Sequence, residues 1–467
     1  MYHVIYLGNS LDTFKYTINP AIYSAEIPQN SRMADITTLG STNWRDQRNI
    51  FGIKDQDRFG HIYVIGKTGV GKSTLLLNMA ISDIEKGKGI CVIDPHGDLA
   101  ETLLEYIPAE RKEDVIYFNP QDSEFPIAFN PFFDVPPHSR HLVVSGIIST
   151  FKKIWLDSWG PRLEYILRFC ILTLLEYPEA TLLDIQPLLT DIYFRNTVLD
   201  HVTNKHVIDF WKQEFEKYPQ TLRAEMIAPI LNKTGVFLAN IPLRNIVGQK
   251  TRGLDIGAIV NEGKILIANL AKGLIGEDAC SILGSVLITA IQLAVTARSN
   301  QDEHKRTPFF LYVDEMHSFI SLSFADILAE ARKYKLSLFL THQYIEQISE
   351  TIRSAVFGNV GTLISFRVGA TDAAYLAKEF RPIFSETDFV NLPKYTMYIK
   401  LMIDGATSKG FSAETLPLKK SSISYKEKIK ELSRKWYGRN KDQVEAEIFE
   451  RRSYKSPDDA DRNLFSQ

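Results

Sequence analysis

A glycine-rich loop lies between an apolar strand and a helix, and it limits the possible folds more than any other feature. The loop, residues 66–73 (GKTGVGKS), follows the apolar segment HIYVI and precedes the helix-forming segment TLLLNMA. It fits the pattern GxxxxGK[ST] in the strand–loop–helix context that this pattern requires. The sequence therefore predicts an α/β domain that binds a nucleotide at the end of one strand.

The residue types of the loop explain this chemistry. The glycines at positions 66, 69 and 71 let the backbone wrap around a polyphosphate with its N–H groups pointing inward, and the helix N-terminus attracts negative charge. Lys72 can reach the β and γ phosphates, and the Ser73 hydroxyl can ligate Mg²⁺. The predicted nucleotide-binding residues are Gly66, Lys67, Thr68, Gly69, Val70, Gly71, Lys72, Ser73 and Thr74.

A second motif places two carboxylates at the end of another apolar strand. Residues 308–313 (PFFLYV) lead into Asp314 and Glu315, which is the form of a Walker B strand. Asp314 is expected to hold Mg²⁺, and Glu315 is expected to orient and deprotonate the attacking water. The alternative is that the two acids cap the next helix.

A polar strand end supplies a candidate for sensing the γ-phosphate. The apolar strand 336–340 is followed by Thr341, His342 and Gln343. We predict that Gln343 contacts the γ-phosphate or the attacking water. We interpret His342 as an ordinary loop residue without a role in catalysis.

Two arginines are candidates for reaching the nucleotide of a neighbouring subunit. Arg367 lies in the otherwise apolar segment 364–368. It either forms an ion pair within the fold or acts as an arginine finger, which contacts the nucleotide bound by the neighbouring subunit. Arg332, in the segment AEARKY, is the second candidate, and its alternative is a solvated helix end.

Strand and helix patterns alternate on both sides of a helical stretch, which predicts one mostly parallel α/β domain interrupted by an all-α insertion. The expected parts are residues 1–45 (an N-terminal segment with short strands), 46–137 (first part of the α/β domain), 138–258 (insertion), 259–416 (second part) and 417–467 (a basic tail). The expected strands are His61–Ile65, Gly89–Asp94, Val115–Phe118, Lys264–Leu270, Phe309–Val313, Ser337–Leu340, Thr362–Val368 and Tyr395–Met402.

Composition and charge exclude several classes of protein. With 45% hydrophobic and 24% charged residues the chain is not disordered. Its net charge of −2 means that any nucleic-acid contact must be local. Three widely spaced cysteines without a CxxC pair argue against a disulfide framework or a zinc site. The most membrane-like stretch, 279–297, is interpreted as a buried core helix, so a soluble, cytoplasmic protein is expected.

Four motifs in a fixed order resemble the HerA/FtsK superfamily of RecA-like motors. They are GKTGVGKST (66–74), CVIDPHGDL (91–99), FLYVDEMHSF (310–319) and LAEARKYKLSLFLTHQ (328–343). Three further segments resemble the DNA-binding ATPase domain of conjugative coupling proteins in type IV secretion systems: WGPRLEYILR (159–168), LRNIVGQ (243–249) and NEGKILIANLAKG (261–273). The likeness covers about residues 45–415.

This resemblance implies a RecA-like ring, a hexamer of identical subunits, that hydrolyses ATP with Mg²⁺ and moves DNA, single- or double-stranded, through its central pore. By the family pattern, Lys72, Glu315, Gln343 and Arg367 are catalytic, and Ser73 and Asp314 hold the metal. Possible partners are a relaxase or secretion-channel proteins, which would bring the chain to the inner membrane. The alternatives are a HerA-type helicase working with a nuclease, and a secretion or assembly ATPase that does not grip DNA.

The remaining candidates are less specific. Lys250, Arg252 and Lys272 are the candidates for DNA contacts on pore loops. The turn that carries Asp94, His96 and Asp98 lies where ligands of open sheets gather, and its alternative is a polar turn. The basic tail contains Trp436 and Tyr437, which suit nucleic-acid contact, although a solvated helix or flexible tail is the alternative.

Overall fold

The computed structural model describes residues 35–43, 48–321, 324–419, 421 and 423–452. The chain divides into two compact units. The first comprises residues 1–117, 257–269 and 294–429, and the second comprises 118–256, 270–293 and 430–467. The domain boundaries expected from the sequence stay predictions.

The first unit is built on an eleven-stranded sheet in the order β2-β1-β13-β10-β9-β3-β8-β7-β4-β6-β5. Its parallel part contains β3 (Ile62–Ile65), β4 (Gly89–Asp94), β5 (Val115–Phe118), β6 (Ile265–Asn269), β7 (Phe309–Val313), β8 (Leu336–His342) and β9 (Thr362–Ser365). The pairs β3–β8, β3–β9, β4–β6, β4–β7 and β7–β8 are all parallel. The predicted α/β class with a mostly parallel central sheet and a helical insertion is confirmed.

The other side of the sheet is antiparallel. It contains β1 (Ile36–Thr42), β2 (Ile50–Lys54), β10 (Thr396–Lys400) and β13 (Phe411–Glu414), while β11 (Met402–Ile403) and β12 (Ala406–Thr407) form a separate small hairpin. Four strand predictions were too long, but those at 61–65 and 264–270 overran β3 and β6 by at most one residue at each end. The strand expected to run to Val368 ends at Ser365, because the chain then turns toward the glycine-rich loop, and the strand expected at 395–402 is divided between β10 and β11.

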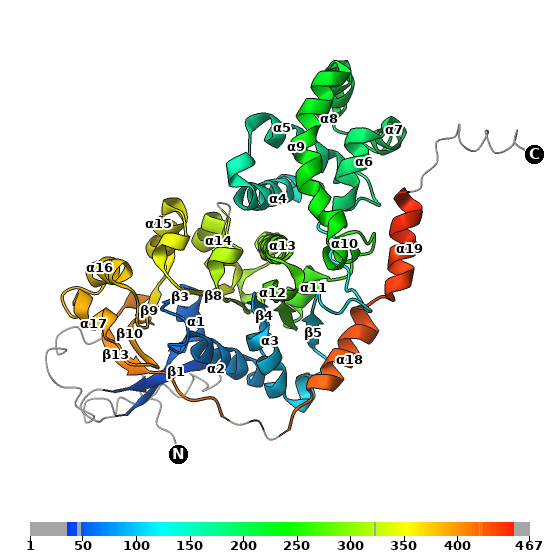
Figure 1. The fold of residues 1–467 in the computed structure, drawn as a ribbon. Helices are drawn as coiled ribbons and strands as arrows, with labels where there is room; N and C mark the ends of the chain where they lie inside the picture. The colour runs from blue at the N-terminus through cyan, green and yellow to red at the C-terminus, as the bar shows by residue number, and fades with distance from the viewer. Residues whose placement is uncertain (1–34, 44–47, 322–323, 420, 422, 453–467) are drawn as a thin grey trace, which may run out of the picture. The chain divides into compact units, whose positions relative to one another are not determined.

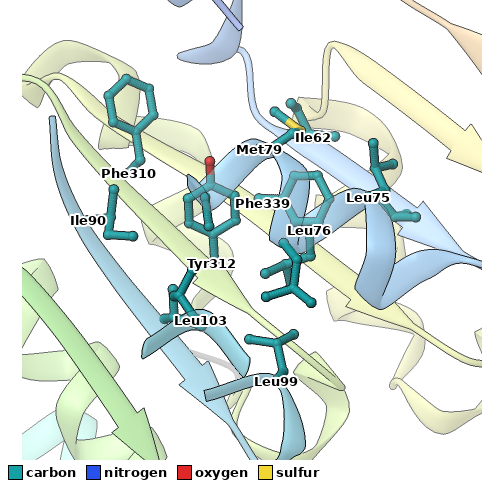
Figure 2. Packing of buried hydrophobic residues seen from close by; sticks show 14 of the residues in the cluster. Ile62, Leu75, Leu76, Met79, Ile90, Leu99, Leu103, Phe310, Tyr312 and Phe339 are labelled. Carbon is teal, nitrogen blue, oxygen red and sulfur yellow. The ribbon is translucent and has the colours of Figure 1, made fainter. Parts of the chain in front are cut away.

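Two helices cover one face of the sheet and bury its alternate residues. Figure 1 shows α2 (Lys72–Glu85) and α3 (Asp98–Leu103) on this face, and α14 (Phe324–Glu330) and α15 (Glu350–Asn359) on the other. Figure 2 shows Leu75 and Leu76 of α2 packed with Tyr312 and Phe339 of the sheet. Because side chains of a strand alternate between faces, every second strand residue contributes to this core. The remaining helices of this unit are α1 (Asp55–Arg58), α11 (Ile256–Asn261), α16 (Ala370–Glu379) and α17 (Glu386–Val390).

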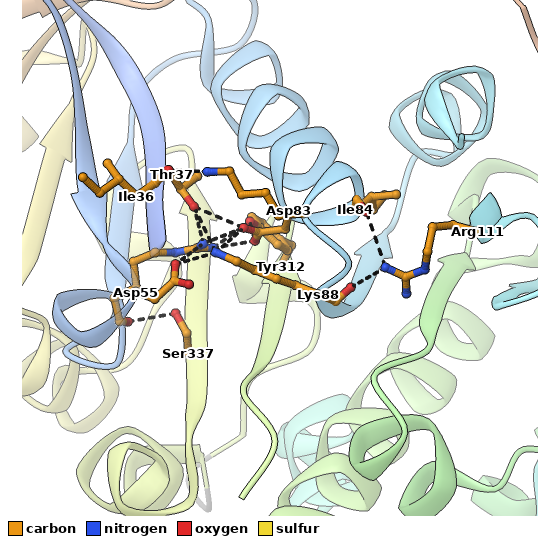
Figure 3. Close-up of polar contacts among 11 residues, drawn as sticks. Ile36, Thr37, Asp55, Asp83, Ile84, Lys88, Arg111, Tyr312 and Ser337 are labelled. Atoms are coloured by element: carbon orange, nitrogen blue, oxygen red, sulfur yellow. Dashed lines mark hydrogen bonds and ion pairs between the residues drawn. The ribbon is translucent and has the colours of Figure 1, made fainter. Parts of the chain in front are cut away.

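A buried polar cluster joins α2 to the sheet (Figure 3). Arg58 donates to both carboxylate oxygens of Asp83 at 2.7 Å, and to the Tyr312 hydroxyl and Thr37 Oγ1 at 2.8 Å each. The Tyr312 hydroxyl in turn donates to Asp83 at 2.5 Å. Arg58 is 1% exposed and Asp83 is fully buried, so both charges need compensation. Each has a second partner, Asp55 at 3.5 Å from Arg58 and Lys88 at 3.3 Å from Asp83.

The second unit is helical. Its helices are α4 (Arg140–Ile154), α5 (Pro161–Leu174), α6 (Ile185–Thr190), α7 (Ile192–Leu199), α8 (Lys205–Asp209), α9 (Gln220–Ala239), α10 (Ile241–Val247), α12 (Lys272–Ile275) and most of α13 (Glu277–Thr296). Trp211 is fully buried, and its indole N–H donates to Thr173 Oγ1 at 2.8 Å.

The basic tail forms two helices, α18 (Lys426–Tyr437) and α19 (Lys441–Arg452). In the second unit, Val444 is fully buried and Glu445 accepts from Arg244 at 2.9 Å. Arg451 forms an ion pair with the buried Asp184 at 2.7 Å. The second tail helix, α19, is therefore packed within this unit.

One described helix, Glu277–Ser299, is long and apolar enough to cross a membrane. The bent pair α9–α10 passes the same test when counted as one span. Of the most apolar window of Glu277–Ser299, 61% is buried in the protein, which supports its interpretation as a core helix. The three cysteines, Cys91, Cys170 and Cys280, are buried and form no disulfide bond.

Candidate nucleotide-binding site

The glycine-rich loop is held between two neighbouring strands. It leaves β3 and enters α2, and its glycines 69 and 71 have φ values of 74° and 127°, which side chains rarely allow. Gly66 N–H donates to the His342 carbonyl at 3.2 Å, and Lys67 N–H donates to the Arg367 carbonyl at 2.9 Å. The loop is thus attached to the residues that end β8 and follow β9.

Lys72 is turned into this loop. Its ammonium donates to the carbonyls of Gly66 at 2.6 Å and Lys67 at 3.1 Å, and the residue is 5% exposed. Burial lowers the pKa of Lys72, while the nearby carboxylates of Glu315 and Asp314 favour its charged form. Ser73 is exposed in the first turn of α2, so its hydroxyl is accessible to a ligand.

The two acids of the second motif lie at the same edge of the sheet, because the carboxyl ends of parallel strands meet there. Asp314 follows β7 and accepts a hydrogen bond from Thr341 Oγ1. Burial raises the pKa of Asp314 to about 6. Glu315 is 5% exposed and adopts φ 47°, ψ 57°, a left-handed conformation that non-glycine residues seldom occupy. Strain of this kind gathers at functional sites.

Glu315 is oriented by three neighbours. Gln343 Nε2 donates to Glu315 Oε1 at 2.8 Å, and His317 Nδ1 lies 3.4 Å from Glu315 Oε2. Glu315 N–H donates to Thr341 Oγ1 at 3.0 Å. The structure therefore brings the sequence-predicted Lys72, Asp314, Glu315 and Gln343 to one edge, and it fixes the side chain of the proposed water-activating base.

The donor set fits Mg²⁺ bound together with phosphates. Among the described residues, no group of three or more His, Cys, Asp or Glu side chains could hold a metal ion by itself. Mg²⁺ usually keeps waters and takes one or two carboxylates plus substrate phosphates. A buried Asp314 and an exposed Ser73 hydroxyl suit that role.

The other sequence candidates fall in different places. The Asp94 carboxylate accepts from the N–H groups of His96 at 2.8 Å and Ala100 at 2.9 Å, so it holds the turn before α3, which favours the polar-turn interpretation. The prediction that His342 lies in a loop was wrong, because it is the last residue of β8. It is buried and its Nδ1 lies 2.9 Å from the Tyr63 hydroxyl, which indicates a structural role. Burial lowers its pKa to about 3.

The two candidate arginines are both exposed. Arg367 lies directly beside the glycine-rich loop, whereas Arg332 precedes β8 at the opposite edge of the sheet. Only Arg367 therefore lies at the edge that carries the site, and its role across a subunit boundary stays a prediction.

The candidate DNA contacts lie in the second unit. Lys250 pairs with Glu179 at 2.5 Å, and Arg252 pairs with Asp255 at 2.7 Å. Lys272 is the first residue of α12. Exposed ion pairs are weak, so the side chains of Lys250 and Arg252 can still exchange these partners for DNA phosphates. Their role in DNA binding stays a prediction.

Comparison with known proteins agrees with this geometry. Residues 56–187 match the family model described as "Helicase HerA, central domain". A solved structure of the bacterial conjugative coupling protein TrwB, in its unbound form, aligns with a TM-score of 0.56 and 15% identity over 79% of this chain and 88% of that chain. VirB4 of Thermoanaerobacter pseudethanolicus aligns with a TM-score of 0.56 and 14% identity over 82% of this chain and 96% of that chain. The chain has the fold of a HerA/FtsK-type P-loop ATPase. No curated protein sequence matches the chain.

Within this P-loop ATPase fold, TrwB is also known in complex with ADP and Mg²⁺; that structure aligns with a TM-score of 0.57 and 15% identity over 79% of this chain and 88% of that chain.

The sequence motifs did not indicate two residues of this candidate nucleotide-binding site. Thr341 uses one hydroxyl to contact both the Asp314 carboxylate and the Glu315 N–H, and His317 contacts the Glu315 carboxylate. The signal for Thr341 was its register: Val313 pairs with Leu340, so the next residues, Asp314 and Thr341, are neighbours. His317 lies in a 3₁₀ turn that no periodicity indicated.

Replacing Thr341 by valine is expected to lower kcat for ATP hydrolysis by about 10-fold or more and to raise the Mg²⁺ concentration needed, because a hydrogen bond to a charged group contributes roughly 1.5–3 kcal/mol. Steady-state kinetics at several Mg²⁺ concentrations measure this. Thr341→Ser keeps the hydroxyl and serves as the control. Equal kinetics for the two variants would contradict this role.

Proposed function

We propose that this protein hydrolyses ATP with Mg²⁺ and uses that reaction, as a hexameric ring, to move DNA in the manner of a conjugative coupling protein. The observation that carries the proposal is the arrangement around Glu315. Gln343 holds the Glu315 carboxylate, and Thr341 holds the Glu315 backbone N–H, at the edge of the glycine-rich loop (the P-loop, residues 66–73). A carboxylate fixed in this way is suited to activating water, which a simple phosphate-transfer enzyme does not need.

DNA movement rests on the fold. The likeness to the coupling protein TrwB and the match to the HerA central domain support a DNA motor. A HerA-type helicase working with a nuclease is the alternative kind of DNA motor. We also propose a cytoplasmic location, with any contact to the inner membrane made through partners such as a relaxase or secretion-channel proteins. The largely buried helix 277–299 supports this location.

A second candidate is an ATPase of secretion or assembly that does not grip DNA. It is favoured by the net charge of −2 and by the carboxylate partners of Lys250 and Arg252. Both candidates share the ATPase site, so they differ only in whether nucleic acid affects it.

DNA is expected to raise the ATPase rate of the purified protein several-fold, because a motor couples hydrolysis to its track. The experiment compares turnover without DNA, with single-stranded DNA and with double-stranded DNA, at low and moderate salt, since phosphate contacts weaken as salt rises. Glu315→Gln is the control for contaminating ATPase. A rate that no DNA changes at either salt concentration would favour the second candidate.

Arg367→Ala is expected to lower ATPase activity about 10- to 100-fold, because an exposed guanidinium beside the P-loop is suited to a neighbour's γ-phosphate. Mixing it with Lys72→Ala, which lacks its own nucleotide clamp, should restore part of the activity at the interfaces where an intact Arg367 meets an intact Lys72. Gel filtration with ATP checks that rings form. Intact mixed rings with no recovered activity would contradict action between subunits.

A further inference from the structure

An exposed aromatic ring lies beside the P-loop, and the catalytic residues described above do not involve it. Tyr395 directly precedes β10 and is 45% exposed. Its φ of 67° places it in the left-handed region, which is uncommon for a bulky residue. An aromatic side chain kept in solvent on such a backbone calls for a physical reason.

The backbone of Tyr395 is fastened to the loop itself. Its N–H donates to the Val70 carbonyl at 2.8 Å, and its own carbonyl accepts from Thr415 N–H at 2.9 Å. These two main-chain bonds fix the unusual conformation and tie the start of β10 to the loop that cradles the phosphates.

The ring rests against the last glycine of the loop. A Cβ atom added at Gly71 would lie 3.1 Å from Tyr395 Cδ1 and equally 3.1 Å from Phe366 Cε1. Phe366 is fully buried, whereas Tyr395 is half-exposed. The P-loop therefore has a buried ring beneath it and a second ring that reaches solvent at its edge.

The position of Tyr395 relative to the carboxylates indicates which part of a nucleotide it meets. Asp314 and Glu315 mark the γ-phosphate end, and they follow β7, which lies beyond β8 on one side of β3. Tyr395 enters from the other side of β3, where β9 and β10 lie. The nucleoside is attached to the opposite end of the phosphate chain from the γ-phosphate, so it extends away from the carboxylates and toward this side.

We propose that Tyr395 forms a base-stacking subsite for the purine of the nucleotide that the P-loop binds. This inference rests on the proposed ATPase function and adds to it the element that recognises the nucleoside. Stacking uses the face of a base, which every base has, and it increases with the area of the ring system. Purine nucleotides therefore bind more tightly than pyrimidine nucleotides at this site.

The experiment compares two ligands on the full chain: ATP and inorganic tripolyphosphate, which has the phosphates but no base. The variant is Tyr395→Asn, because asparagine tolerates the left-handed backbone better than alanine does. ATP affinity should fall about 10-fold, in line with the roughly 1–3 kcal/mol of one base–aromatic stack, while tripolyphosphate affinity stays at the wild-type value. Tyr395→Phe keeps the ring and should restore ATP affinity.

A matched control is Tyr193→Ala, which removes a tyrosine of similar exposure, 49%, from α7 in the helical unit. It should change neither affinity. Unchanged ATP binding by Tyr395→Asn, or an equal loss for ATP and tripolyphosphate, overturns the subsite, since the second result means that the residue shapes the loop. If the wild-type chain binds neither ligand, the proposed function fails together with the subsite.

Discussion

Replacing Glu315 by glutamine is expected to lower kcat for ATP hydrolysis by about two to four orders of magnitude, the usual contribution of a positioned general base. Glutamine has nearly the same shape but cannot take the proton of the attacking water. ATP binding should be retained, because Lys72 and the loop amides contact the phosphates independently of this side chain. Turnover and equilibrium binding of a fluorescent ATP analogue measure the two effects separately.

The matched control is Glu386→Gln, an exposed acid in the first turn of α17. It should leave both measurements unchanged. Wild-type turnover by Glu315→Gln would mean that another group activates water. A loss of ATP binding would mean instead that Glu315 maintains the shape of the site through its contacts with Gln343 and His317.

Replacing Arg58 by methionine is expected to lower the free energy of unfolding by about 3–5 kcal/mol, the usual cost of removing one partner of a buried ion pair. Lys88, 3.3 Å from Asp83, compensates the remaining carboxylate only in part. Asp83 is fully buried and would lose its bidentate partner. Urea unfolding measures the loss. The double variant Arg58→Met/Asp83→Leu removes both fully buried charges and leaves Asp55 and Lys88 paired with each other, so part of the stability should return.

Lys305→Met supplies the comparison at the surface. Lys305 pairs with Asp302 at 3.3 Å, but their side chains are 79% and 74% exposed, so this variant should cost at most about 1 kcal/mol. If Arg58→Met costs no more than Lys305→Met, the buried cluster contributes little to stability.

The same cluster predicts a dependence on pH. Burial alone would raise the pKa of Asp83, but the Arg58 guanidinium, with help from Lys88 and the Tyr312 hydroxyl, holds that pKa below its ordinary value. A carboxyl with a lowered pKa in the folded state stabilises the fold at pH values above about 4, where the unfolded group is ionised as well. This stability is lost as the pH falls further, through the folded-state pKa. Arg58→Met should therefore flatten the fall of unfolding free energy between about pH 4 and lower values.

The sequence predicted best those elements whose side chains are buried on both faces. The strands Gly89–Asp94, Val115–Phe118 and Phe309–Val313 were predicted with the observed bounds, since a short apolar run between polar segments leaves few alternatives. The strands β2 and β13 were missed. Each has partly exposed residues, and β2 contains Gly52, so neither forms a continuous apolar run.

The candidate site was predictable where one local motif specifies it and less so where the fold assembles it. The residues of the P-loop and the pair Asp314–Glu315 could be predicted because each forms a short contiguous sequence motif. The contacts of Thr341 and His317 depend on strand register and on a tight turn. The position of Tyr395 depends on a hydrogen bond to Val70, more than 300 residues earlier in the chain, which no local pattern can indicate.

The two main-chain bonds that anchor the loop, from Gly66 to the His342 carbonyl and from Lys67 to the Arg367 carbonyl, have a mechanical consequence. Tightening of the loop around a triphosphate, or its relaxation after a phosphate departs, pulls on the chain next to Gln343 on one side and on Arg367 on the other. Through these two bonds, a change in the loop when a triphosphate binds or leaves would act directly on the chain that carries the exposed cation Arg367, within a single subunit.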